Sequence, residues 1–90
     1  MDREKLSTAF AKAKLMGLEE GEIMLIEHLL GIQGSFYQGL YDLFYKADFD
    51  NKNRLGNAFP CLAYLDRYMD EPDWFEEELR VKARKAGFPL

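Results

Sequence analysis

Apolar residues recur at helical spacing along most of the chain, and seven of the thirteen aromatic residues lie between residues 34 and 60. From 36 to 47 the apolar positions fall three, four and seven residues apart, which puts them on one face of an α-helix. These positions are Phe36, Leu40, Leu43, Phe44 and Ala47. Ser35 comes just before them and Gln38 three residues later, a pairing typical of helix starts. We therefore predict a central helix that begins at a Ser35 cap and turns this apolar face to the core.

A row of tyrosines follows the same helix. Tyr37, Tyr41 and Tyr45 are spaced by four and lie about 100° around the helix from Phe36. Tyrosine is enriched at interfaces because it combines apolar area with a hydroxyl that tolerates water. We predict that Tyr41 anchors contact with a partner or a second copy.

The alternative is that another helix of the same monomer covers the row. The segment that carries Tyr64 and Tyr68 is the candidate cover. These two tyrosines join the other three as candidate interface residues, and the pattern alone leaves both possibilities open.

Gly39 falls inside the predicted central helix, where glycine costs about 1 kcal/mol relative to alanine. We expect a neighbouring backbone to approach closely at this position. The alternative is that the missing side chain leaves room for a ligand.

The rest of the chain also divides into helical segments. Gly17, Gly31 and Gly87 each follow an apolar periodic stretch and predict helix ends. Helix starts are predicted near Asp2, Glu19, Asp48, Pro60 and Pro72. The fold class is therefore all-α: a single domain over residues 1–90, built as a small bundle of four main helices and one short helix.

Composition and the lack of targeting segments narrow the cellular compartment in which we expect the protein. A hydrophobic content of 48% supplies one core, and the single cysteine, Cys61, rules out an internal disulfide. The charged DREK start does not match a signal peptide, and no apolar run is long enough to cross a membrane. We expect a cytoplasmic protein that makes no use of a membrane.

The net charge of −4 argues against a nucleic-acid partner, because such proteins gather a strong basic surface. Basic residues nevertheless cluster in the first and last helices. If these helices lie side by side, Lys12, Arg80 and Arg84 form a possible anion-binding site, which a nucleotide-like ligand could use. Ordinary surface charge is the alternative.

Catalytic and metal signatures are missing from the sequence. His28 has no second histidine for a metal pair, and Cys61 is a lone cysteine in an apolar segment. The segment from Asp48 resembles a calcium loop only at its start, because Phe59 stands where the bidentate glutamate belongs. We therefore expect no enzyme activity, no metal and no cofactor.

The stretch GSFYQGLYDLFYKADFDNKNRLGNAFP, followed by Tyr64 and Tyr68, resembles short uncharacterised proteins of phages and mobile elements. The shared features are a Phe-Tyr pair near a helix start, an Ala-Asp step, an Asn-containing turn and a Phe-Pro restart. The resemblance covers roughly residues 34–68 and implies an accessory protein inside a bacterial cell. It implies no activity and no site residues.

The sequence thus predicts a non-enzymatic protein-interaction module that acts on a protein partner or on itself through an aromatic helix face. The alternative is a small-molecule or nucleotide-binding protein that combines the tyrosine rings with the basic residues of the terminal helices.

Overall fold

The computed structural model describes residues 2–90, and these residues form six helices and no strand. The first five are α1 (Arg3–Leu15), α2 (Glu20–Leu29), α3 (Ser35–Lys46), α4 (Phe49–Ala58) and α5 (Leu62–Asp70). The sixth is continuous through α6 (Pro72–Trp74), a π-helical turn η1 (Phe75–Leu79) and α7 (Arg80–Ala86). The all-α fold class is confirmed. The expected number of four main helices and one short helix is wrong, because the segment expected to be short, α4, has ten residues, as many as α2.

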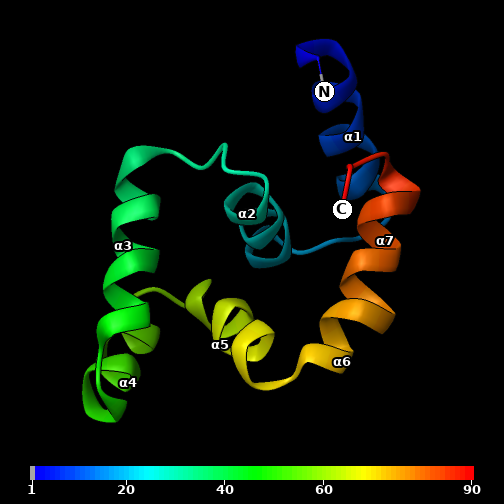
Figure 1. Ribbon diagram of the computed structural model, residues 1–90. Coiled ribbons are helices and arrows are strands. Elements are labelled where there is room, and N and C mark those ends of the chain that lie inside the picture. The colour runs from blue at the N-terminus through cyan, green and yellow to red at the C-terminus, as the bar shows by residue number, and fades with distance from the viewer. Residues whose placement is uncertain (1) are drawn as a thin grey trace.

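The helices are arranged side by side across the molecule (Figure 1). Helices α2 and α5 contact each other in the middle, with α3 and α4 on one side and α1, α6 and α7 on the other. The Cα atoms span 39 × 28 × 18 Å, so the molecule is barely two helices thick in its shortest dimension. An outer helix such as α3 therefore keeps much of its surface in solvent.

Local chemistry explains several helix ends. The Asp2 and Asp48 carboxylates accept hydrogen bonds from the backbone N–H groups of Lys5 and Asn51, at 2.8 Å and 2.9 Å. Gly17, Gly31 and Gly87 have φ angles of 85°, 71° and 109°, which side chains rarely tolerate. All three glycines end helices, as the sequence predicts.

The start of α3 differs from the prediction. Gly34 is the residue before its first turn, and Ser35 is already helical. Gly34 has no side chain to cap the helix, so the Ser35–Gln38 capping box is not formed.

The orientation of α3 also differs from the prediction. Leu40 and Phe44 are buried as expected, and the third buried residue of the helix is Tyr41, at 0% exposure. Phe36 and Leu43, which we assigned to the core face, are 63% and 53% exposed. The helix is rotated toward Tyr41, because α2 and α5 cover that side, whereas the side with Phe36 and Leu43 stays largely in solvent.

The described residues form no helix long and apolar enough to span a bilayer.

The two phenylalanines of α3 differ in exposure, and we therefore expect their replacement by alanine to change the free energy of unfolding by different amounts. Phe44→Ala should lower the free energy of unfolding by about 3–5 kcal/mol, because it leaves a cavity in the core. Phe36→Ala should change it by about 0.5 kcal/mol or less, as for an exposed side chain. Urea denaturation of both variants measures the difference. Equal losses would show that the orientation of α3 is wrong.

Candidate functional site

Tyr41, the proposed anchor of an interface, is enclosed within the monomer. Its ring lies 4.9 Å from the ring of His28 in α2, measured between centroids, and its hydroxyl faces Gln33 and Cys61. Neither neighbour has hydrogen-bond geometry, and the hydroxyl has no partner within residues 2–90. Burial is the main cause that raises the pKa of Tyr41 to about 12, so it stays neutral. Tyr41 is thus a core residue, and its side chain is not available to a partner.

Tyr45 lies at the edge of the same cluster. It is 41% exposed, and its hydroxyl is 3.3 Å from Nε2 of His28. Burial lowers the pKa of His28, although the charge of Asp42 opposes this effect. Tyr45 and His28 together fasten α3 to α2.

Tyr64 and Tyr68 hold α5 to its neighbours. The Tyr64 hydroxyl donates a hydrogen bond to the Glu19 carboxylate, which raises the pKa of Tyr64 to about 12. Tyr68 packs edge-on against Phe75, with ring centroids 5.0 Å apart. Both tyrosines are half-buried, so their contacts are mainly within the monomer.

Gly21 is what lets Tyr64 lie so close to α2. A Cβ atom on Gly21 would overlap Cδ2 and Cε2 of the Tyr64 ring. The neighbouring backbone that we expected close to Gly39 is not found there, and a close approach, by the ring of Tyr64, occurs at Gly21 instead. Gly39 is exposed, and a Cβ atom there would meet nothing within 4 Å.

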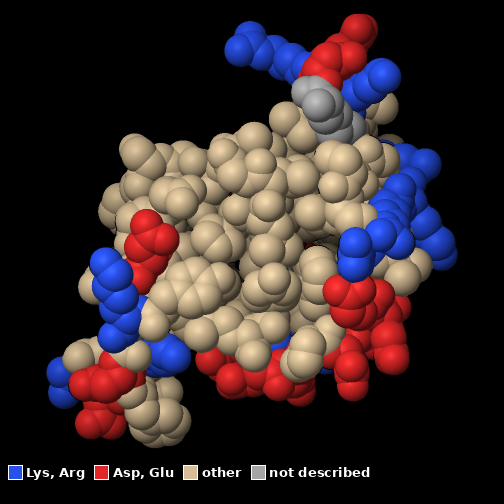
Figure 2. Space-filling view, in the orientation of Figure 1, with Lys and Arg blue, Asp and Glu red and all other residues tan. Residues whose placement is uncertain are grey.

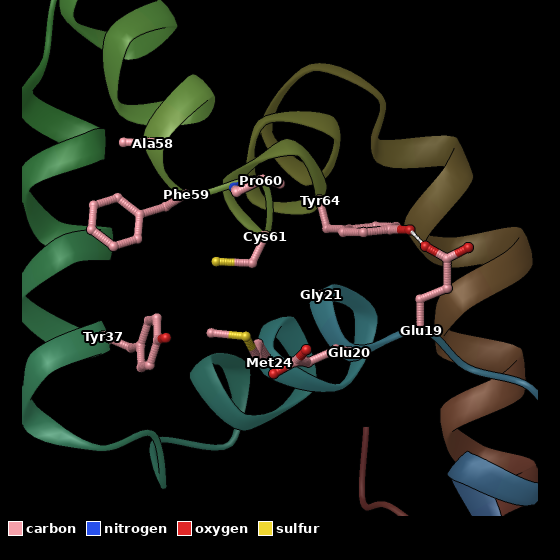
Figure 3. Close-up of a pocket in the computed structure, with 10 residues that line it drawn as sticks. All are labelled: Glu19, Glu20, Gly21, Met24, Tyr37, Ala58, Phe59, Pro60, Cys61 and Tyr64. Carbon is pink, nitrogen blue, oxygen red and sulfur yellow. Dashed lines mark hydrogen bonds between the residues drawn. The ribbon is translucent and has the colours of Figure 1, made fainter.

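Tyr37 lines an open pocket of about 400 Å³ between α2, α3 and α5 (Figure 3). Its ring and that of Phe59 form one side, and the sulfur atoms of Met24 and Cys61 face each other beside them. The remaining lining residues are Glu19, Glu20, Gly21, Ala58, Pro60 and Tyr64. We call this space the tyrosine pocket.

The surface of α3 is the most apolar part of the exterior. Nine large apolar side chains of the described residues are exposed, and six of them belong to α3 or lie within three residues of its ends. These six are Ile32, Phe36, Tyr37, Leu43, Tyr45 and Phe49. Phe36, Gly39 and Leu43 follow at spacings of three and four and so share one line of the helix, which we call the α3 stripe.

The basic residues do not join the tyrosines. Helices α1 and α7 do lie side by side, as the anion-site hypothesis requires, but α3 is on the opposite side of the molecule (Figure 1). Arg80 pairs with Glu76 at 2.8 Å, and Arg84 donates to the Leu90 carbonyl. Figure 2 shows basic side chains gathered over α7 and acidic ones just below them, over the start of the same helix. One site built from Lys12, Arg80, Arg84 and the α3 tyrosines is therefore not formed.

Cys61 and His28 do not make a reactive pair. Burial raises the pKa of the Cys61 thiol, which keeps it protonated at neutral pH and so a poor nucleophile. His28 packs on Tyr41 and Tyr45, and no hydrogen bond joins it to Cys61 among the described residues.

Several residues of this region were missed by the sequence analysis. Phe36 and Leu43 were assigned to the core, and the sequence pattern singled out none of Glu20, Gly21 and Met24. An available signal was the second periodic set in α3: Tyr37, Leu40, Tyr41 and Phe44 also fit one helix face. The tyrosine pocket had no signal, because its walls come from segments far apart in the chain.

Alanine is predicted to have opposite effects on stability at Gly21 and at Gly39. Gly39→Ala should raise the free energy of unfolding by about 1 kcal/mol, because the methyl group meets nothing and alanine favours the helix. Gly21→Ala should lower it by roughly 1–2 kcal/mol, because the Tyr64 ring must move. Thermal and urea unfolding measure both variants. Stabilisation by both would mean that Tyr64 does not lie against Gly21.

We expect the burial of His28 to make the stability of the fold sensitive to acid. Burial lowers the pKa of His28 in the folded state from its ordinary value of 6.5, so the unfolded chain takes up the proton more readily. The free energy of unfolding should therefore fall as the pH drops from about 7.5 to about 5.5, with the full contribution present above 6.5. Burial raises the pKa of Glu27, so the protonation of this carboxylate acts in the opposite direction as the pH falls.

His28→Gln is the control for this effect, since His28 is the only histidine. The variant should show a flatter pH profile between the same two values. A decline as steep as that of the wild type would assign the effect to another group.

No protein-family model, curated protein sequence or solved structure matches this chain.

Proposed function

We propose that this protein is a non-enzymatic protein-interaction module whose docking surface is the α3 stripe, with a second copy of the chain as its occupant. The observation that carries the proposal is the outward placement of Phe36 and Leu43, 63% and 53% exposed, on a helix whose opposite face already fills the core. Grouped exposed apolar side chains of this kind mark interaction surfaces.

The α3 stripe is complementary to itself. It runs from a large residue through Gly39 to another large residue, with nearly equal spacing on both sides. An antiparallel copy related by a two-fold axis near Gly39 would set Phe36 against Leu43 of the second copy. At the crossing, the missing side chain of Gly39 allows the two backbones to approach closely.

Charges along α3 are compatible with this arrangement. Asp42 and Lys46 are the charged residues of the helix, and both are exposed. About the same axis, Tyr37 of the second copy stands opposite Asp42, and Gln33 opposite Lys46. Like charges therefore do not face each other, a juxtaposition that would weaken binding.

The exposed area limits the strength of such a dimer. With about 200 Å² for a whole phenylalanine side chain, Phe36 and Leu43 leave on the order of 200 Å² exposed. A standard interface offers roughly 800 Å² on each partner, a little over half of it apolar. We therefore expect a weak dimer that forms as the concentration rises. The proposed setting, which rests on the resemblance of residues 34–68, is a phage or mobile-element accessory protein inside a bacterial cell.

Sedimentation equilibrium tests the proposal. The average mass should rise from 10.5 kDa toward twice that value as the concentration approaches about 1 mM, where an association of about −4 kcal/mol becomes visible. Phe36→Lys should abolish the rise and leave the fold intact, because Phe36 is exposed.

Leu15→Lys is the matched control, since Leu15 is 88% exposed on α1, away from α3. It should dimerise as the wild type does. The proposal fails if the wild type stays monomeric at the highest concentration, or if Leu15→Lys weakens association as much as Phe36→Lys.

A further inference from the structure

The tyrosine pocket combines aromatic walls with acidic side chains. Tyr37 and Phe59 form one wall, and Glu20 lies beside Met24 at the opposite side (Figure 3). The ring of Tyr64 forms another wall. It packs against Gly21, and its hydroxyl donates a hydrogen bond to Glu19, so the packing of α5 on α2 fixes the position of this wall. The pocket is therefore built by contacts that also hold the fold together.

The charges that line the pocket are of one sign. Glu19 and Glu20 contribute carboxylates, and among the residues that the structure describes no lysine or arginine lines the pocket. Glu19 accepts the Tyr64 hydroxyl, whereas Glu20 is exposed and makes no ion pair within residues 2–90. An incoming cation would thus find an unpaired carboxylate at Glu20.

The start of α2 does not turn the pocket into an anion site. Helix N-termini attract anions, but here the first turn already holds the carboxylates of Glu20 and Glu22. One of the backbone groups, the N–H of Glu19, donates to Oε1 of Glu22 at 3.1 Å. A phosphate or carboxylate ligand would meet like charge.

The aromatic rings suit the apolar part of an organic cation. The rings of Tyr37 and Phe59 offer apolar area against which an alkyl chain can pack. The sulfur atoms of Met24 and Cys61 offer a polarisable apolar surface for an alkyl chain. The Cys61 thiol stays protonated and adds no charge.

We propose that the tyrosine pocket binds an organic cation with an apolar stem, the cation at Glu20 and the stem between the sulfur atoms and the rings of Tyr37 and Phe59. A free alkylamine and the lysine or arginine side chain of a protein share this chemistry. Phe36 connects the pocket to the α3 stripe, because its ring centroid lies 5.2 Å from that of Tyr37 and 6.0 Å from that of Phe59. The proposal does not require the dimer.

Amide NMR titration of the full chain tests this proposal, at a protein concentration below that at which association is detected. Butylamine should shift the amides of Glu20, Gly21 and Cys61 in a saturable way, and 1-butanol, which lacks the charge, should bind at least several times more weakly. A short peptide with one lysine is compared with the same peptide in which norleucine replaces that lysine and so removes the charge. Tighter binding of the lysine peptide than of butylamine would identify a protein side chain as the source, and equal binding would identify a small amine.

Variants at two exposed carboxylates complete the test. Glu20→Gln should weaken butylamine binding by about two- to fivefold, the size expected for a partly exposed ion pair. Glu77→Gln, in the π-helical turn η1 away from the pocket, should bind as the wild type does. The proposal is overturned if butylamine leaves these amides unmoved, if 1-butanol binds equally well, or if Glu77→Gln weakens binding as much as Glu20→Gln.

Discussion

The contact between Tyr64 and Gly21 joins the two middle helices, and the rest of the molecule depends on it. The ring of Tyr64 occupies the space that a side chain at position 21 would need, and its hydroxyl reaches Glu19 at the start of α2. Since α2 and α5 lie between the two outer groups of helices, their separation sets where both groups pack. The same contact fixes one wall of the tyrosine pocket. Stability and the candidate ligand site therefore share a single structural cause.

The burial of Tyr41 is the second constraint, because it sets the rotation of α3. A large ring with a polar tip is placed among His28, Gln33 and Cys61, which belong to α2, the α2–α3 connection and the start of α5. Once Tyr41 points inward, Phe36 and Leu43 must point outward, because they lie on a different line of the helix. The apolar exterior of α3 is thus a consequence of filling the core with a tyrosine.

Along the last helix, acidic and basic side chains are separated. Basic side chains gather over α7 and acidic ones at the start of the same continuous helix, so that they complement its dipole and form pairs one turn apart such as Arg80–Glu76 (Figure 2). The α3 end offers apolar rings and, in the adjoining pocket, unpaired negative charge. The basic residues of α7 and the aromatic surface of α3 therefore lie apart. This arrangement favours an apolar docking surface beside a cation site over one combined nucleotide site.

Local chemistry in the sequence determined the helices: the caps at Asp2 and Asp48 and the positive φ angles at Gly17, Gly31 and Gly87 act within a few residues of the chain. It also determined that Leu40 and Phe44 are buried. The choice between Phe36 and Tyr41 as the next core residue was left to the tertiary structure, because two overlapping periodic sets in α3 are equally apolar and only the neighbours from α2 and α5 distinguish them. The tyrosine pocket likewise exists only in the folded chain, since it needs residues 19–24, 37 and 58–64 together, and no periodicity within one segment can report the distance between separate segments.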